Sequence, residues 1–197
     1  MGYLSKNTVH TTKEVRKVRI IAGKYKSRQI TFSTVNNKNT RPTTDRLRET
    51  LFNWLIPYII KAKCLDAFAG SGALGFEALS RLAESCDFFE IDNQAIKQLT
   101  YCKDKLNADN AFIYQNDVIR YLQNCSNYQV IFLDPPFNSK LLNKALMLIL
   151  KNTNIGSDTL IYAEYSTKTE VNLLNYFKTI KQTKQGQVTA CLLWKKD

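Results

Sequence analysis

The sequence predicts an α/β fold built on a mixed, largely parallel sheet, and three observations indicate it. From residue 62 onward, short apolar runs alternate with helical patterns, which is typical of parallel strands joined by crossover helices. The first of these runs leads directly into a glycine-rich loop. The last two, 177–182 and 188–194, are separated only by a turn around Gln185 and Gly186, so we expect an antiparallel hairpin.

The elements of this main part, residues 40–197, follow one another with short connections. Strands are expected at 63–68, 86–91, 111–115, 129–134, 159–166, 177–182 and 188–194. Helices are expected at 72–82, 93–106, 117–124 and 139–150, with a short one near 169–175.

The residues before this part differ in character. Residues 1–17 are predicted to form a basic tail, and residues 18–36 a basic β-hairpin around Gly-Lys-Tyr-Lys-Ser. A helix should then begin after Thr44, a plausible N-cap, and run to about Leu55. Its apolar face would carry Leu47, Leu51, Phe52 and Leu55.

Length and composition exclude several classes of protein. A chain of 197 residues allows one domain with a small appendage, and no apolar run approaches the roughly 20 residues that span a bilayer. The N-terminus has no apolar signal region, so we expect a cytoplasmic protein without a membrane partner. The five cysteines form no C-x-x-C pair and His10 is the only histidine, so we expect core thiols and no metal site.

The positive charge is concentrated at the front of the chain. Residues 1–61 contain 13 Lys and Arg against 3 Asp and Glu, whereas residues 62–197 contain 15 against 14. A nearly neutral body with a basic front end favours a partner rich in phosphate, such as a nucleic acid, over a merely solvated lysine-rich surface.

The glycine-rich loop has the spacing of a nucleotide-binding turn. Gly70, Gly72 and Gly75 satisfy G-x-G-x-x-G between a predicted strand and a predicted helix. Glu90 follows Gly70 by twenty residues at the end of the next strand, where an acid can accept both hydroxyls of a ribose. We therefore favour a nucleoside-containing cofactor over a simple tight turn.

Two further acids bear on which cofactor binds. Asp66 precedes the loop by four residues, and a carboxylate there suits a cationic ligand such as the ammonium of S-adenosylmethionine better than the pyrophosphate of NAD. Asp117 follows the third strand of the main part and could receive an adenine amino group. It could equally be the N-cap of the next helix.

The stretch VIFLDPPF (130–137) predicts a second half of the site. Each proline fixes its own φ and restricts the residue before it, so Asp134 and the Pro135 carbonyl are held as two acceptors at the end of a buried strand. They match the two N–H donors of an exocyclic base amine, and Phe137 could stack on that base. The simpler alternative is a strand that merely ends in Asp-Pro-Pro. Methylation at cytosine C5 is disfavoured because no Pro-Cys pair offers a nucleophile.

Together these segments resemble a known family. LDAFAGSGALGFEALSR, FFEIDN and FLDPPF are similar to the class I S-adenosylmethionine-dependent amino methyltransferases. RPTTDRLRETLFNWL and VRIIAGKYKSRQI narrow the resemblance to the RsmD-like methyltransferases of bacterial small-subunit (16S) ribosomal RNA. The resemblance covers about residues 18–195. It implies a seven-stranded Rossmann-like sheet and transfer of one methyl group to the 2-amino group of a guanine.

The resemblance also implies roles for individual residues. The cofactor site would comprise Asp66, Phe68, Gly70, Ser71, Gly72, Glu90 and Asp117. Asp134, Pro135, Pro136 and Phe137 would hold and stack the guanine, and RNA phosphates would meet Lys24, Lys26, Arg28, Arg41, Arg46 and Arg48. Ala22 and Ser27 stand where the resembling family commonly has glycine, so the hairpin turn departs from the family pattern.

Two other functions remain open at this point. D-P-P-aromatic does not choose the base, so an adenine amino methyltransferase on DNA or RNA is the first alternative. A catalytically silent RNA-binding relative is the second. For Arg46 and Arg48, the alternative to phosphate contact is a solvated helix face paired with Asp45 and Glu49. We expect a monomer that acts on small-subunit ribosomal RNA, either naked or within an assembling ribonucleoprotein.

Overall fold

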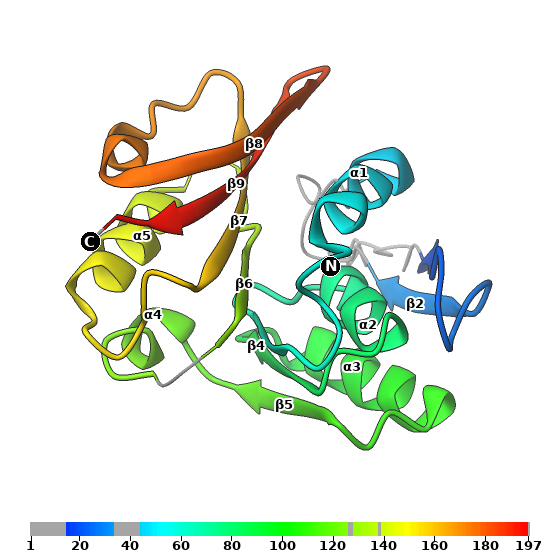
Figure 1. Cartoon of the computed structure of the whole chain (residues 1–197). Helices are drawn as coiled ribbons and strands as arrows, with labels where there is room; N and C mark the ends of the chain where they lie inside the picture. The colour runs from blue at the N-terminus through cyan, green and yellow to red at the C-terminus, as the bar shows by residue number, and fades with distance from the viewer. Residues whose placement is uncertain (1–14, 34–43, 126–127, 138, 197) are drawn as a thin grey trace, which may run out of the picture.

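A computed structural model describes residues 15–33, 44–125, 128–137 and 139–196. Its centre is a seven-stranded sheet in the order β5-β4-β3-β6-β7-β9-β8 (Figure 1). The strands are β3 (Lys63–Asp66), β4 (Ser85–Glu90), β5 (Ala111–Gln115), β6 (Val130–Leu133), β7 (Leu160–Ser166), β8 (Phe177–Gln185) and β9 (Val188–Lys195). The first five strands are parallel and β9 runs antiparallel to both β7 and β8, which confirms the predicted mixed sheet and its C-terminal hairpin.

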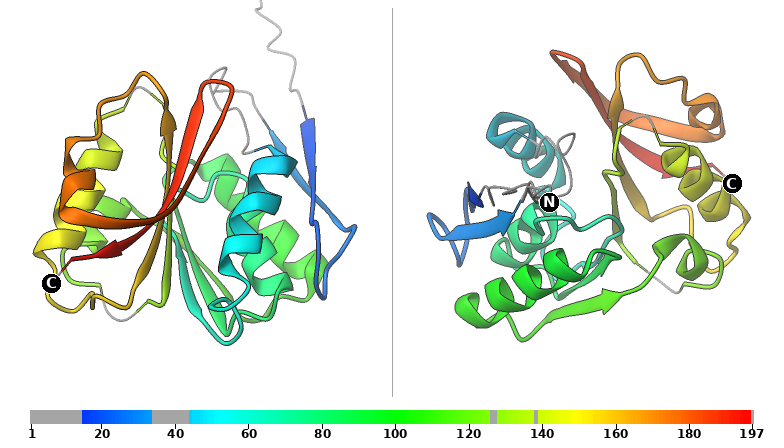
Figure 2. Two further views of the ribbon diagram at one scale, coloured as in Figure 1. Left: turned by 45° about the horizontal axis from the view of Figure 1, so that its top comes forward. Right: turned by 180° about the vertical axis from the view of Figure 1, so that it is seen from behind.

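Helices cover both faces of this sheet (Figure 2). One face carries α1 (Asp45–Leu55), α2 (Ala73–Ser80) and α3 (Asn93–Leu106). The other carries α4 (Val118–Tyr121), α5 (Leu141–Lys151) and the 3-10 helix η1 (Asn172–Tyr176). The predicted helices are therefore present, with α4 reduced to about one turn.

The buried strands divide their side chains between two cores, because successive residues of a strand point to opposite faces. Val130 and Phe132 of β6 belong to the core under α1 to α3. Ile131 and Leu133 belong to the core under α4 and α5. This explains why the strands read as unbroken apolar runs: both of their faces are covered.

All five cysteines are buried and free, as predicted for core thiols. Within the described residues, no helix is long and apolar enough to cross a membrane.

A second, two-stranded sheet lies outside the helices, formed by β1 (Val15–Arg19) and β2 (Gln29–Ser33). The predicted hairpin is present, but its first strand begins three residues earlier than expected, within the stretch assigned to the tail. Ser27 adopts a left-handed conformation with φ of 67°, which is unusual for a residue other than glycine. Glycine adopts such a conformation without strain, so Ser27 stands at a position that glycine would favour.

The turn of this hairpin is fixed to α2 through two side chains. The carboxylate of Glu77 accepts the backbone N–H groups of Ile21 at 2.7 Å and Ala22 at 3.1 Å. The hydroxyl of Ser80 accepts the N–H of Tyr25 at 2.9 Å and donates to the carbonyl of Ala22. The hairpin is therefore docked on the helix that begins at the glycine loop.

Candidate active site

The point where the strand order reverses lies between β3 and β6, and ligands of open α/β sheets bind at the carboxyl end of such a point. Asp66 ends β3 and Asp134 directly follows β6, while Glu90 ends the neighbouring strand β4. Burial first of all, and then the charges of Asp134 and Glu90, raise the pKa of Asp66 to about 7, whereas the N–H of Gly75 lowers it. Three acids thus meet at one edge of the sheet, and a bound cation would relieve their repulsion.

The glycine loop has the conformation that its spacing predicts. Gly70 and Gly72 have φ of 50° and 76°, and Gly72 is the N-cap of α2. A side chain on Gly75 would collide with the ring of Phe88 on β4, so this glycine permits close packing of helix on strand. Asp66 accepts the N–H of Gly75 at 3.0 Å, which ties the first turn of α2 to the end of β3.

Glu90 is held in place by the backbone around it. One oxygen accepts the N–H of Gly70 at 2.9 Å, and the other accepts those of Ile91 at 2.7 Å and Asp92 at 2.9 Å. The carboxylate therefore joins the glycine loop to the end of β4, at the position where a ribose was predicted to bind. Its contact with a ribose stays a prediction.

The other predicted cofactor residues line the same edge of the sheet. Phe68 and Ser71 are half-buried in the loop itself. Asp117 is exposed and is the N-cap of α4, accepting the N–H of Ile119 at 2.9 Å. The capping role is thus confirmed, and the contact of Asp117 with an adenine stays a prediction.

The residues after β6 form a rigid corner. Pro135 is buried, Pro136 is exposed, and Asp134 and Phe137 are half-buried. The carbonyl of Pro136 accepts the N–H of Ser139 at 3.3 Å and its hydroxyl at 2.7 Å, which closes a turn before α5. Asp134 and Phe137 therefore flank two prolines in the chain, and these prolines leave the backbone between them little conformational freedom.

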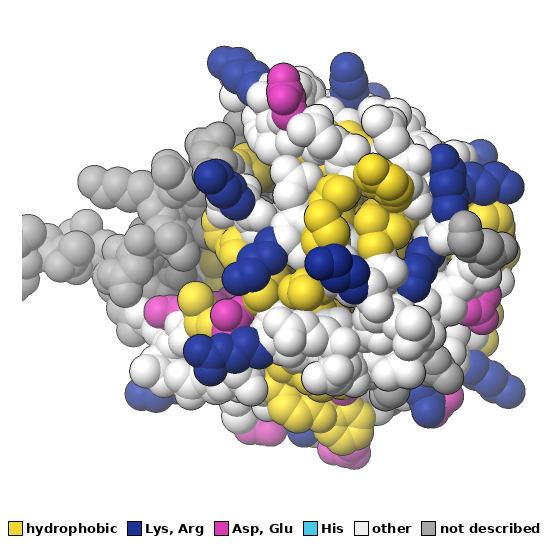
Figure 3. Space-filling view, turned by 90° about the vertical axis from the view of Figure 1, so that its left-hand side faces the viewer, with side chains coloured by type: hydrophobic (Ala, Val, Ile, Leu, Met, Phe, Trp, Pro, Cys, Tyr) yellow, Lys and Arg dark blue, Asp and Glu magenta, His cyan; other side chains and the backbone are white. Residues whose placement is uncertain are grey.

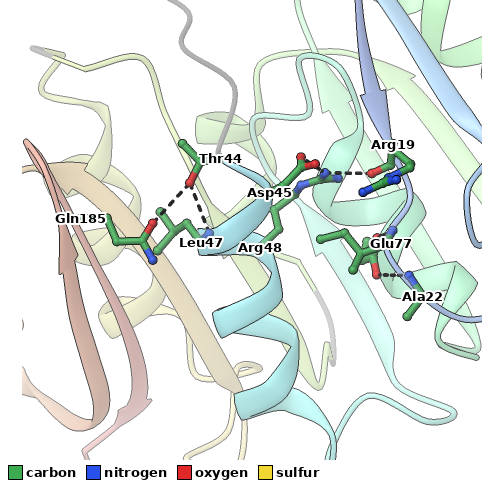
Figure 4. A network of polar contacts seen from close by, with 9 residues as sticks. Arg19, Ala22, Thr44, Asp45, Leu47, Arg48, Glu77 and Gln185 are labelled. Atoms are coloured by element: carbon green, nitrogen blue, oxygen red, sulfur yellow. Dashed lines mark hydrogen bonds and ion pairs between the residues drawn. The ribbon is translucent and has the colours of Figure 1, made fainter.

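Phe137 opens onto a pocket of about 220 Å³ that the sequence did not predict. Its other walls come from the start of α1, the end of β7 and the turn between β8 and β9, contributed by Thr44, Leu47, Glu164, Gln185, Gly186, Gln187 and Val188. Thr44 caps α1 as predicted and also donates to the side-chain oxygen of Gln185 at 3.3 Å, which bridges two walls of the pocket (Figure 4).

Glu164 is the functional candidate that the sequence reasoning missed. It follows the apolar run LIYA of β7 just as Asp134 follows VIFL of β6. An acid directly after each of two buried apolar runs was the available signal, because parallel pairing brings the carboxyl sides of neighbouring runs to the same side of the sheet.

The residues predicted to contact RNA lie in different parts of the structure. Lys24, Lys26 and Arg28 are exposed on the turn of the hairpin beside the C-terminal end of α2, roughly 12 Å along that helix from the glycine loop. Arg46 is exposed on α1. Arg41 lies outside the described residues. Contact of these residues with RNA stays a prediction.

The structure corrects the prediction for Arg48, because the side chain of Arg48 has no exposed surface. Its Nη2 atom pairs with Asp45 at 2.7 Å and donates to the carbonyl of Arg19 at 2.8 Å (Figure 4). Arg48 thus connects α1 to the hairpin. Both the prediction of a phosphate contact and the alternative of a solvated position are wrong for this residue, although its pairing with Asp45 is confirmed.

Positive charge is also present away from the basic front end. Lys178, Lys181 and Lys184 are exposed along β8, and Lys184 adjoins Gln185 at the rim of the pocket. Figure 3 shows the side of the molecule that carries β8 and α5, with Lys and Arg side chains spread around apolar areas. The nearly equal numbers of basic and acidic residues in 62–197 do not reveal this arrangement.

The fold, with its glycine loop and acidic carboxyl edge, is that of the class I S-adenosylmethionine-dependent methyltransferases. A solved structure of yhhF, an Escherichia coli protein provisionally classed as a methyltransferase, superimposes with a TM-score of 0.80 at 37% identity, covering 91% of this chain and 98% of that one. A family model described as "Conserved hypothetical protein 95" matches residues 18–194. The chain therefore belongs to this family, the RsmD family.

Two curated relatives have closely similar sequences. The Ribosomal RNA small subunit methyltransferase D of Haemophilus influenzae is 41% identical over 161 residues, covering 79% of this chain and 82% of the relative. The protein of the same name from Escherichia coli K12 is 42% identical over 148 residues, covering 75% and 74%. These matches agree with the resemblance drawn from the sequence motifs.

No group of three or more His, Cys, Asp or Glu side chains in the described part of the chain is arranged to hold a metal ion.

Proposed function

We propose that the protein transfers a methyl group from S-adenosylmethionine to the 2-amino group of a guanine in small-subunit ribosomal RNA. The observation that carries the proposal is that Asp134 lies near Asp66 of the acidic loop site, while Phe137, three residues later, lines the 220 Å³ pocket. The names of the two curated relatives support ribosomal RNA as the substrate. Such a substrate would be met in the cytoplasm, where we expect the protein to work as a monomer.

The loop site fits the proposed cofactor. The raised pKa of Asp66, caused by burial and by two neighbouring carboxylates, indicates negative charge that a cationic ligand would stabilise. S-adenosylmethionine carries positive charge and, when bound, supplies a methyl group on its positively charged sulfur. Glu90 would accept its ribose hydroxyls, while Gly70 and Gly72 allow the backbone to approach closely.

Asp134 and the carbonyl of Pro135 would act by orientation. A base amine has a poor lone pair because its electrons are delocalised into the ring. Two fixed acceptors that hold both amine hydrogens away from the ring plane would localise that lone pair. The charge of Asp134 would also stabilise the positive charge that develops on the nitrogen, and Phe137 would stack on the extruded base.

Methyl transfer from labelled cofactor to total RNA and to isolated small subunits tests this function. Digestion of the RNA should give N2-methylguanosine, and replacing the target guanosine with inosine, which lacks the 2-amino group, should abolish transfer. Asp134→Ala should bind the cofactor normally and lose transfer by several orders of magnitude, whereas Asp134→Asn should keep partial activity because its amide oxygen still accepts one N–H. Asp109→Ala, an exposed acid after α3, is the matched control and should be unchanged.

N6-methyladenosine in the digest would replace guanine by adenine as the target base. Cofactor binding without transfer to any RNA would instead support a catalytically silent relative. Comparing naked RNA with small subunits shows which of the two is the substrate.

A further inference from the structure

The strands β8 and β9 form a ribbon at the edge of the sheet whose charged residues are all basic. Residues 177–195, which comprise both strands and their turn, include four lysines and no aspartate or glutamate. Lys195 has a role within the fold, because its Nζ donates to the carbonyls of Asn152 at 2.9 Å and Ile155 at 3.2 Å. The other three lysines are exposed on β8: Lys178, Lys181 and Lys184.

The register of the ribbon places two of these lysines on the face of the sheet that carries α1, because directly opposite residues of an antiparallel pair point to the same side. Lys178 lies opposite Trp194, which packs against the core under α1 to α3. Lys181 lies opposite Leu192, which belongs to that core. A register shift just before Lys181 keeps the two lysines on one side although they are three positions apart. Lys184 follows Lys181 by three positions without a shift, so it points to the other face.

The α1-facing side of β8 leads to the pocket. Gln185 lies opposite Val188, and both line the pocket. Lys181 precedes Gln185 by four residues, which is about 13 Å along a strand, and Lys178 precedes it by roughly 20 Å. The two lysines therefore form a row that follows β8 away from the rim of the pocket.

An aromatic pair lies at the far end of this row. The Nζ of Lys178 is 5.7 Å from the centre of the Trp194 ring, and the ring of Tyr58 meets that of Trp194 edge-on with 6.5 Å between centroids. Trp194 is half-buried, whereas 41% of Tyr58 is exposed. The neighbouring side chains of Ile56 and Ile60 are exposed as well. An aromatic ring is thus present at the surface beside a cation.

Exposed cations in a row with an aromatic surface are typical of sites for single-stranded nucleic acid, where cations follow the phosphates and rings stack on bases. Lysines on an edge strand can also serve only to prevent pairing with another chain. That alternative explains charge on β8, but it does not explain why Lys178 and Lys181 share one face with Tyr58 in a row that leads to the pocket. A base that enters the pocket is unpaired, and RNA loops offer unpaired neighbours on either side of it.

We propose that the α1-facing side of β8 binds the single-stranded RNA next to the target nucleotide, with Lys178 and Lys181 at its phosphates and Tyr58 stacked on one of its bases. The inference rests on the proposed function, because it takes the pocket as the place of the target base.

This contact would be separate from that of the basic hairpin. Helix α1 stands between the two surfaces, since Thr44 donates to Gln185 on one side and Arg48 donates to the carbonyl of Arg19 on the other (Figure 4). RNA held at both surfaces would be fixed on both sides of the pocket.

Binding to a single-stranded oligouridine at several salt concentrations tests the phosphate contacts. This probe contains no guanine and requires no cofactor, so the result does not depend on methyl transfer. Replacing Lys178 and Lys181 together by glutamine should lower the slope of log affinity against log salt by about 1.4, at roughly 0.7 for each lost phosphate contact. The matched control replaces Lys63 and Lys151, two exposed lysines at the opposite edge of the sheet, by glutamine and should keep the wild-type slope.

Tyr58→Leu tests the stacking contact. It removes an aromatic ring and no charge, so oligouridine should bind about tenfold more weakly with an unchanged salt slope. Affinity for a fully paired RNA should stay the same, because the bases of a duplex are already stacked on one another. Both variants should bind S-adenosylmethionine with wild-type affinity, which verifies their folding.

Two results would overturn the proposal: a wild-type salt slope in the double lysine variant, or wild-type affinity of Tyr58→Leu for oligouridine. A protein that shows both expected changes but methylates no ribosomal RNA would count against the proposed function instead. With methylatable RNA, the double lysine variant should raise KM and leave kcat unchanged, because the contacts lie outside the pocket.

Discussion

Replacing Glu77 by alanine tests whether the basic hairpin is held by α2. The carboxylate has no exposed surface and accepts three hydrogen bonds, from Ile21 N at 2.7 Å, Ala22 N at 3.1 Å and Arg81 Nε at 2.8 Å. Each bond to a charged group contributes about 1.5–3 kcal/mol, but the three share one acceptor and are not additive. Leaving the donors and the Arg81 charge without this partner should cost about 3–5 kcal/mol in the free energy of unfolding.

The expected signature is local as well as global. Urea denaturation should show the lower stability, and hydrogen exchange should show lost protection at the amides of Ile21, Ala22 and Tyr25. The first turn of α2 should stay protected, because Phe76 packs on Phe88 independently of the hairpin. RNA affinity should therefore fall more than cofactor affinity.

Two further variants make this test sharper. Glu77→Gln keeps an amide oxygen that can accept some of these N–H groups, so it should lose only about 1.5–3 kcal/mol. Glu84→Ala removes an exposed acid that forms a long ion pair with Lys63 at 3.7 Å, and it should change stability by less than about 0.5 kcal/mol. If Glu77→Ala unfolds at the same urea concentration as Glu84→Ala, or keeps its hairpin amides protected, Glu77 does not hold the hairpin on α2.

Two other predictions concern the ligands. Burial and the neighbouring acids raise the pKa of Asp66 to about 7, so protons and a cationic cofactor compete for this carboxylate near neutral pH. Calorimetry should therefore show S-adenosylmethionine affinity rising roughly tenfold from pH 6 to pH 8 and levelling above, with a flat profile in Asp66→Asn. The folded pKa lies above the unfolded value of about 3.9, so this group should lower stability progressively from pH 4 to pH 7. Neutralising Lys24, Lys26 and Arg28 together should reduce the salt slope of RNA binding by about 2, at roughly 0.7 per lost phosphate contact, while Lys151→Ala leaves it unchanged. A flat wild-type pH profile, or an unaltered salt slope, would contradict these assignments.

Much of this architecture follows from short-range signals. The N-cap at Thr44, the tight turn at Gly70 and Gly72, and the corner at Pro135 and Pro136 each depend on the conformations open to a few neighbouring residues. The antiparallel end of the sheet follows from the short connection between β8 and β9. Such features could be predicted because the residues that determine them are adjacent in the sequence.

Arg48 and Glu77 show why other features could not. Arg48 is an ordinary charged residue on an amphipathic helix until the carbonyl of Arg19, 29 positions earlier, is placed beside it. Glu77 meets Ile21 and Ala22 across more than 50 positions. No periodicity or motif marks these contacts, because each depends on where the hairpin docks. The side chains that connect the hairpin, α1 and α2 are consequently those whose roles the sequence conceals.

Glu164 is an intermediate case, and it shows how a predicted fold can be used further. Once β6 and β7 are accepted as parallel neighbours with both faces buried, the first polar residue after each apolar run marks the carboxyl side of the buried stretch, although β7 itself continues to Ser166. Parallel pairing then brings these two residues to the same edge, so Asp134 and Glu164 become neighbours without any knowledge of side-chain positions. The sequence did not predict the pocket wall formed by the turn at Gln185–Val188. This turn reaches the pocket only because β9 runs antiparallel to β7. The position of Glu164 is thus predictable from strand order, whereas the pocket that it lines depends on the C-terminal hairpin.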